Sequence, residues 1–326
     1  MNNSRPQILP SLLERISLFI GFWVVACSSV AFNGFILYFS LQKNKIEGEF
    51  KYFVANLASL NSLYSFSNLL QSIFFIEIDY QGFFCSAAGV LGLYAGEAAG
   101  IALIPVSLNR YVSVFHSHFY NQLFGSKRAC FTICLLCNVG ALAGSLINLP
   151  FTEYGRSRSA LYCWFYTSSG KRDLLYVVVQ MTRAGLVLGP CLFVLFTSLR
   201  IRKRIAKQLI LSKSLNQKQH LARTEELVRA TLFQAVLPVL LTVPVVLCVG
   251  IAMLSGYLNE NIERPLWYNI CVNLTFLMYN AGPLIDAIAT FMVVGPYGRA
   301  LRHLFRKTTT VAVIAPEIDN IHEARV

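Results

Sequence analysis

Charged residues are scarce in this sequence. They make up 13% of its 326 residues, whereas a typical soluble domain contains about 25%. Apolar residues make up 55% of the chain, and its mean hydropathy is +0.54. This composition excludes an ordinary water-soluble fold and indicates a protein whose side chains largely face lipid.

The motifs of several enzyme classes are also missing. The sequence contains no His-Glu-x-x-His zinc motif, no glycine-rich phosphate loop ending in lysine, and no cysteine and histidine cluster with metal-ligand spacing. His116 and His118 are two residues apart, a spacing that does not share a helical face. We therefore expect no enzyme, no catalytic residue, and no bound cofactor or metal ion.

The apolar residues gather into seven long segments. Each has about 20 to 30 residues, enough for a helix to cross a hydrocarbon core of about 30 Å at about 1.5 Å per residue. We predict an all-α membrane protein, a seven-transmembrane helix bundle with a short amphipathic eighth helix. The predicted spans are 16–41, 53–76, 84–115, 129–151, 174–199, 228–256 and 266–294.

The distribution of basic residues predicts the orientation of the bundle. The net charge of +12 would suit nucleic acid, but lysine and arginine lie between the spans and form no basic groove. The first, third and fifth connections and the C-terminal tail, with Arg229 at the edge of the sixth span included, hold 19 of the 28 basic residues. Basic loops face the cytoplasm. We therefore predict a multi-pass plasma-membrane protein with residues 1–15 outside the cell and 308–326 inside. The first span lacks a cleavage site and is expected to act as its own insertion signal.

The nine cysteines divide into two groups by this topology. Seven fall within predicted spans, where a free thiol acts as a small apolar side chain. The other two are Cys85, at the outer end of the third span, and Cys163, in the long outer connection. Both face an oxidising compartment, so we predict a disulfide that ties the outer loop across the mouth of the bundle. Two unpaired thiols are the alternative.

Residues that are landmarks of a known receptor family lie on both sides of Cys85 in the sequence. Arg110 lies twenty-five residues after Cys85, within Leu108-Asn109-Arg110-Tyr111, so about 37 Å of helix separates the outer cysteine from an arginine at the inner face. This tetrapeptide is similar to the Asp-Arg-Tyr motif of G-protein-coupled receptors. Further landmarks occur in the family's order: Asn33, Asn56-Leu57-Ala58, Pro190, Pro244 and Pro283. The chain resembles this family over nearly its whole length.

The departures from the common receptor pattern indicate a particular branch. Asn61 stands in place of the usual sodium-binding aspartate, Asn109 replaces the acid before the arginine, the fourth span lacks tryptophan, and the sixth lacks Cys-Trp-x-Pro. Instead, the sixth span carries Gln234, Pro238 and Pro244, and the seventh ends in Tyr297-Gly298-Arg299. These features resemble the nematode serpentine chemoreceptors of the Str superfamily, with class delta (Srd) as the first choice among its classes.

This resemblance implies a chemosensory, olfactory-type receptor in the sensory cilia of neurons. It would bind a small molecule or short peptide in the outer cavity and activate a heterotrimeric G protein through the inner ends of spans three, five and six. The alternative function is a membrane transporter or ligand-gated channel, which also places charges inside spans. The sequence shows no inverted repeat typical of transporters and no ring of polar pore-lining residues.

Two ionisable residues inside the predicted spans are candidates for ligand binding, because a charge within the membrane is costly. Glu97 lies about 18 Å of helix below Cys85, and Arg183 lies about 14 Å below the start of the fifth span. Their similar depths on neighbouring spans allow a direct ion pair, which lowers the cost of burying either charge. The alternatives are that each faces a hydrated pocket separately or that Arg183 extends outward to water.

A second group of candidates lies at the inner face. Arg110 has a permanent charge and a planar set of donors, suited to an inactive-state contact or to a partner's carbonyl groups. Its neighbours in the motif, Asn109 and Tyr111, belong to the same predicted switch. Since Asn109 cannot form the ion pair found in many receptors, another group must restrain Arg110 or the restraint is weak, and Asp286 is a candidate. A snorkelling basic anchor is the alternative role for Arg110.

Proline and glycine positions predict helix bends and close packing. A proline inside a helix removes an intrahelical hydrogen bond and can kink the helix. Such a kink either lets the helix pivot or is purely structural. The candidates are Pro190, Pro238, Pro244 and Pro283. Gly89, Gly92, Gly96 and Gly100 form a small-residue ridge on span three. We favour packing within the bundle for this ridge, with a receptor dimer as the alternative. Residues 295–307 are expected to form an amphipathic helix on anionic lipid.

Overall fold

The computed structural model describes most of the helical part of the chain. The described residues are 12–42, 46, 48–73, 83–148, 153–156, 163–166, 174–211 and 277–304, together with 232, 236–237, 239–241, 243–244, 247 and 274. The predicted sixth span therefore lies largely outside the described residues, and so does Pro238.

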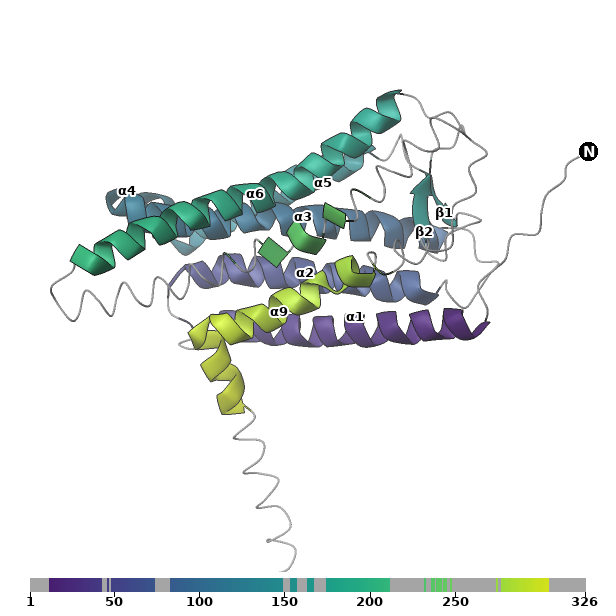
Figure 1. The fold of residues 1–326 in the computed structure, drawn as a ribbon, viewed down its shortest axis with the longest axis horizontal. Coiled ribbons are helices and arrows are strands. Elements are labelled where there is room, and N and C mark those ends of the chain that lie inside the picture. Colours follow the sequence, from purple (N-terminus) through teal and green to yellow (C-terminus); the bar gives the residue numbers. More distant parts are fainter. Residues whose placement is uncertain are drawn as a thin grey trace, which may run out of the picture.

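The long helices run along one direction of the bundle, with α6 inclined to the others (Figure 1). They are α1 (Leu12–Leu41), α2 (Phe50–Ile73), α3 (Phe83–Phe115), α5 (Lys127–Asn148) and α6 (Leu174–Leu211). Each overlaps one predicted span, because an apolar segment of that length satisfies its backbone in lipid only as a helix. Among the described helices, Ile16–Leu41, Ala87–Phe115 and Lys127–Leu146 are long and apolar enough to cross a membrane.

The helix α6 is longer than the sequence predicted. The predicted span ended at residue 199, but the helix continues to Leu211 and includes the basic residues that we had placed in a connection. Hydropathy detects where the apolar segment ends, whereas arginine, lysine and glutamine remain good helix formers beyond that point. The basic cluster is therefore presented by a helix.

Two small elements connect the long helices. The short helix α4 (Ser117–Phe124) follows α3 and lies at one end of the bundle. The strands β1 (Glu153–Arg156) and β2 (Cys163–Tyr166) form an antiparallel hairpin at the other end, with Arg156 opposite Cys163 (Figure 1). Both strands contact α3. The hairpin therefore brings the segment that begins at Cys163 against the helix that carries Cys85.

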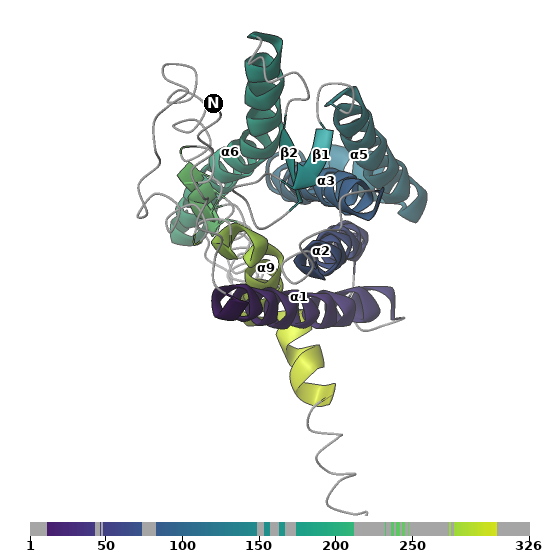
Figure 2. The same cartoon turned by 90° about the vertical axis from the view of Figure 1, so that its right-hand side faces the viewer.

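The central helix is α3, which contacts α2, α4, α5 and α6. Figure 2 shows α2 between α1 and α3, with α9 (Gly282–Val293) beside α1 and with α5 and α6 on the far side of α3. The helices α1 and α9 also contact each other. The first and last parts of the chain are thus packed side by side.

Two glycines of the predicted ridge allow the close approach of α2 and α3. A Cβ atom at Gly92 would lie 2.7 Å from the Oγ of Ser67, and one at Gly96 would lie 3.3 Å from the Tyr64 ring. Both neighbours belong to α2. Packing within the bundle is therefore confirmed for these two glycines.

A sharp bend follows α9. The helix Gly295–Leu304 is turned by 91° from Gly282–Met292 and projects away from the long helices (Figure 1). If the two pieces are counted as one bent span, it is a fourth segment able to cross a membrane in the described part of the chain. This bend places Tyr297 over the end of α1.

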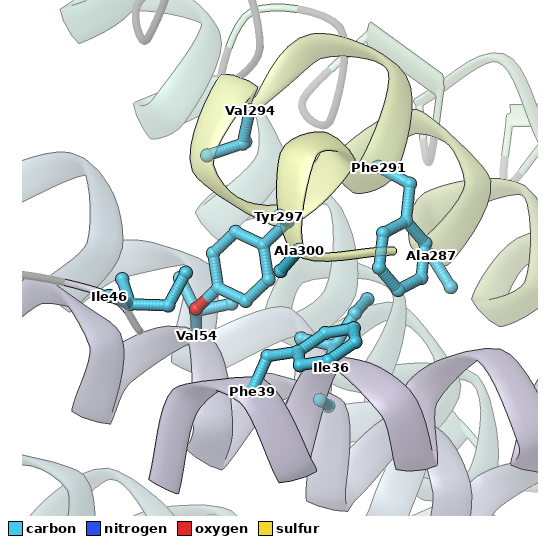
Figure 3. Close-up of a cluster of buried hydrophobic side chains, with 10 residues drawn as sticks. Ile36, Phe39, Ile46, Val54, Ala287, Phe291, Val294, Tyr297 and Ala300 are labelled. Carbon is cyan, nitrogen blue, oxygen red and sulfur yellow. The ribbon is translucent and has the colours of Figure 1, made fainter. Parts of the chain in front are cut away.

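A buried hydrophobic cluster fastens this bend to α1 and α2, and Figure 3 shows Tyr297 at its centre. We call this the Tyr297 cluster. Its buried members are Ile36, Phe39, Ile46, Val54, Ala58, Ala287, Phe291, Val294, Tyr297 and Ala300.

Candidate functional site

Glu97 is buried in the middle of α3, with 2% of its surface exposed. The Oγ of Ser145 on α5 donates a hydrogen bond to the Oε2 of Glu97 over 2.9 Å. Gly144 lies beside the same oxygen, since a Cβ there would be in ordinary van der Waals contact with it at 3.7 Å. The carboxylate group thus faces α5, a direction that sequence reasoning missed because it considered only the fifth span.

The predicted partners of Glu97 and Cys85 cannot be compared with the structure. The side chain of Arg183 lies outside the described residues, although α6 is described around it. The side chains of Cys85 and Cys163 also lie outside them. The Glu97–Arg183 ion pair and the Cys85–Cys163 disulfide therefore stay predictions.

Arg110 is buried near the Phe115 end of α3, with 6% of its surface exposed. Its Cζ lies 4.4 Å from the centroid of the Phe50 ring, at the start of α2. This distance is well within the range of a cation–π interaction. Phe50 was not among the sequence candidates, because nothing in its local sequence marks it as a partner of Arg110.

The neighbours of Arg110 join α3 to α6. Asn109 is buried, and the Tyr111 ring stacks on Phe115 with centroids 4.6 Å apart. Tyr111 also packs against two fully buried isoleucines of α6, Ile201 and Ile205. The motif residues therefore lie where the extended part of α6 meets α3.

Asp286 lies on α9, at the contact between this helix and α2. The Nδ2 of Asn61 donates a hydrogen bond to its Oδ2 over 2.9 Å. The structure thus assigns Asp286 a partner that the sequence did not predict. Its suggested role as a restraint on Arg110 stays a prediction.

Further polar contacts hold the same helices together. The Nδ2 of Asn33 on α1 donates to the carbonyl of Pro283 on α9 over 3.2 Å. The hydroxyl of Tyr64 on α2 donates to the Oδ1 of Asn280 over 2.9 Å. Buried polar groups need such partners, because an unpaired group in a low-dielectric interior costs several kcal/mol, roughly 2–7. Asn33 and Asn61 were sequence landmarks, but only the fold shows what they bind.

Tyr297 is fully buried in the helix that follows the bend. Its hydroxyl lies 2.7 Å from the Oγ of Ser40 on α1, and Figure 3 shows its ring pointing toward α1 and α2. Burial raises the pKa of Tyr297 to about 12, while the hydrogen bond with Ser40 and the charge of Arg110 oppose this shift. The phenol of Tyr297 is therefore neutral at physiological pH.

The candidate prolines occupy different environments. Pro190 is buried within α6. Pro283 is also buried but lies in the first turn of α9, a position that does not need its missing N–H. Pro244 is exposed. The role of these residues as pivots stays a prediction.

The described cysteines fit the interpretation of span thiols as small apolar side chains. Cys27, Cys130, Cys134, Cys137 and Cys191 are all free. In the part of the chain that the structure describes, no group of three or more His, Cys, Asp and Glu side chains is placed to hold a metal ion.

Comparison with known proteins identifies the family. The sequence model of the 7 transmembrane receptor (rhodopsin family) matches residues 32–285. The crystal structure of squid rhodopsin is similar in fold, with a TM-score of 0.68 and 16% sequence identity. That match covers 94% of this chain and 92% of the squid protein. No curated protein matches the sequence.

The chain belongs to the rhodopsin family of seven-transmembrane receptors. It is therefore a G-protein-coupled receptor, a multi-pass plasma-membrane protein and not an enzyme. The predicted all-α seven-transmembrane bundle is confirmed by the shared fold. The narrower resemblance to nematode chemoreceptors stays a prediction.

Proposed function

We propose that this receptor is chemosensory, binds a small molecule or short peptide in the outer part of the bundle, and activates a heterotrimeric G protein at the inner face. The resemblance to the Str superfamily supports the chemosensory role. It rests on Gln234, Pro238 and Pro244 of the sixth span and on the Tyr297-Gly298-Arg299 sequence after the seventh. That superfamily also suggests a location in a sensory cilium, with residues 1–15 outside the cell.

The burial of Arg110 is the observation that carries the coupling part of this proposal. A guanidinium at the end of the central helix, 6% exposed, has lost most of its hydration, and an ionisable residue buried in a membrane bundle is by default a candidate for function. Movement of the surrounding helices would make these donors available to carbonyl groups of a G protein. Tyr111 and Asn109 would adjust with it, because both belong to the same turn of α3.

The extension of α6 supports the same assignment. Its inward face is anchored by Ile201 and Ile205, which pack beside Tyr111. Its outward face is basic and exposed, and the exposed residues are Arg200, Arg202, Lys203, Arg204 and Lys207. A rigid basic helix beside Arg110 favours an acidic partner surface, since charge complementarity speeds association.

The buried carboxyl group of Glu97 supports the proposal that the bundle binds a ligand. A few fixed polar groups in apolar surroundings are the usual form of a small-molecule site, and Ser145 holds one oxygen of Glu97 in place. Arg183 would supply the opposite charge from α6. Together they would select a ligand by its charge and hydrogen-bonding groups.

A ligand screen with a G-protein readout tests this function. Cells expressing the receptor would be exposed to acidic, basic and neutral odorants and to short peptides, while G-protein activation is recorded. Arg110→Ala is the matched control for coupling. Purified receptor in liposomes, without G protein, would be tested for ion and solute flux with the same ligands. Flux in the liposomes without any G-protein response would favour a transporter or channel instead.

A further inference from the structure

The charge of Arg110 has no acidic neighbour in its own motif, because Asn109 precedes it. The cost of burying an arginine must nevertheless be offset by a favourable contact. The structure provides one from another helix, since the guanidinium carbon lies 4.4 Å from the Phe50 ring centroid. The π-face of an aromatic ring attracts a cation, and more strongly when the site is shielded from water.

The Phe50 ring is half-buried and packs against two hydrophobic clusters. Phe50 packs against the Tyr297 cluster on one side. On the other side it packs against a second cluster, which includes Val106 and Val112 of α3. These valines lie four residues before and two residues after Arg110, so the ring packs on the part of α3 that carries Arg110. A ring fixed in this way can hold the guanidinium without a large loss of its own conformational freedom.

Tyr297 extends the contact to the helix after the bend. It belongs to the cluster against which Phe50 packs and is fixed by its hydrogen bond with Ser40. Arg110 therefore contacts α2 through Phe50, and Phe50 in turn packs on the cluster that contains Tyr297 of the Gly295–Leu304 helix. A displacement of α3 relative to α2 would separate Arg110 from the Phe50 ring.

We propose that the Phe50 ring restrains Arg110 in the inactive receptor and takes the place of the carboxylate that Asn109 lacks. Activation then requires Arg110 to leave the ring before it can contact the G protein. Phe50 is a positioning residue in this scheme, since it acts through Arg110. This inference rests on the proposed coupling role of Arg110.

Substitutions at Phe50 test the restraint through ligand-free G-protein nucleotide exchange. Phe50→Leu keeps an apolar side chain but removes the π-face, and we expect basal exchange to rise about two- to thirty-fold, the range that corresponds to one cation–π contact. Phe50→Tyr keeps the ring and should leave basal exchange near that of the unmodified receptor. Phe32→Leu is the matched control, because Phe32 packs against the same Tyr297 cluster and contacts Phe291.

A rescue experiment distinguishes loss of the restraint on Arg110 from a general destabilisation of the receptor. Asn109→Asp in the Phe50→Leu background restores an acid beside Arg110 and should lower basal exchange again. A structural defect at Phe50 would not be corrected by a carboxylate on α3. Unchanged basal exchange in Phe50→Leu, an equal rise in Phe32→Leu, or no rescue by Asn109→Asp would each overturn the proposal. If Phe50→Leu does not fold, Phe50→Met serves as the second variant without a ring.

Thermal unfolding of purified receptor tests the contact without any G protein. If Phe50 and Arg110 interact, the fall in Tm for Phe50→Leu with Arg110→Ala is smaller than the sum of the two single falls. Additive falls would overturn the proposal. Full agonist signalling by Arg110→Ala would instead remove the proposed coupling role, even where the unfolding data show the contact. The two failures are therefore distinguishable.

Discussion

The hydroxyl groups of Tyr297 and Ser40 lie 2.7 Å apart, although the two residues are 257 positions apart in the chain. The Oγ of Ser40 also donates to the carbonyl of Ile36 over 2.8 Å. Since a serine hydroxyl has one proton, Tyr297 must be the donor in the contact with Ser40. The helix after the bend is thus hydrogen-bonded to the end of α1.

Tyr297→Phe tests this contact and the buried state of the phenol. We expect a loss of about 1 kcal/mol in the free energy of unfolding near pH 7. The native pKa is about 12 and the unfolded value about 10, so the unfolded state loses its proton first. Stability of the unmodified receptor should therefore be constant below pH 10 and fall by about 3 kcal/mol between pH 10 and 12 from this residue.

The measurement is denaturant unfolding in detergent at a series of pH values. In Tyr297→Phe, the free energy of unfolding should not show the decrease between pH 10 and 12 that ionisation of this phenol causes. Tyr38→Phe, at an exposed tyrosine, is the control and should keep it. Parallel stability curves for the unmodified receptor and Tyr297→Phe from pH 10 to 12 would contradict the prediction.

The outer disulfide is tested by mutating its two cysteines. Either Cys85→Ser or Cys163→Ser should impair surface delivery or ligand response, because each leaves the outer connection untied. Cys134→Ser and Cys137→Ser, on α5, are the controls and should have much smaller effects. Mass mapping under non-reducing conditions would show the bond directly, and two free outer thiols would refute it.

Arg110→Ala should abolish or severely reduce G-protein activation while surface expression stays near normal. The physical reason is the loss of a planar donor group from the end of α3 that contacts the extended α6. The measurement is agonist-driven nucleotide exchange, normalised to receptor at the cell surface. Arg128→Ala, at an exposed position near the start of α5, is the control. Full agonist signalling by Arg110→Ala would exclude the assigned role.

A double-mutant cycle tests whether Glu97 and Arg183 form an ion pair. If they do, Glu97→Gln or Arg183→Gln alone leaves a buried charge uncompensated, at a cost of about 3–5 kcal/mol. Each single mutant should then lose more folded receptor than the double mutant. Ser145→Ala should lose less, because it removes one neutral donor to Glu97. Strict additivity between Glu97 and Arg183 would exclude direct pairing.

The same mutants, assayed with ligands of different charge, separate a ligand contact from a structural pair. A loss confined to acidic agonists in Arg183→Gln would identify this arginine as the anchor for a carboxylate. Equal losses for acidic, basic and neutral agonists would favour a structural role.

Gly92→Ala tests the close packing of α2 and α3. The added Cβ would meet the Oγ of Ser67 at 2.7 Å, and this hydroxyl donates to the Tyr64 carbonyl. We expect a loss of about 1–3 kcal/mol in stability, typical of overpacking, and partial recovery in Gly92→Ala with Ser67→Ala. Gly140→Ala is the control, since nothing lies within 4 Å of its Cβ position. Equal stability changes for the two alanine substitutions would contradict this prediction.

The course of the chain through the membrane was predictable from local composition. The predicted span 84–115 corresponds to α3 (Phe83–Phe115), and the predicted span 16–41 lies within α1 (Leu12–Leu41). Lipid leaves a long apolar segment no other backbone arrangement. The end of α6 was not predicted, because hydropathy reports only on apolar segments. Beyond residue 199 the chain is polar, and hydropathy does not report whether a polar segment remains helical.

The candidate residues were predictable only where the side chain or its motif is unusual. Glu97 stood out as a charge in an apolar span and Arg110 by its place in a receptor-like motif, and both are buried in the structure. Ser145 and Phe50 are ordinary residues for a membrane helix, so their sequence gave no reason to single them out. They became candidates only because α5 and α2 place them against Glu97 and Arg110.

The amino-acid sequence by itself determined that this chain crosses a membrane, which apolar segments cross it, and that Glu97 lies within one of them. These properties follow from hydrophobicity and charge, which are summed over neighbouring residues and need no knowledge of distant ones. The tertiary structure alone decided that Phe50 lies over Arg110, that Ser145 faces Glu97, and that Tyr297 binds Ser40. Such contacts depend on how helices cross and where the chain bends, which is set by packing over the whole bundle.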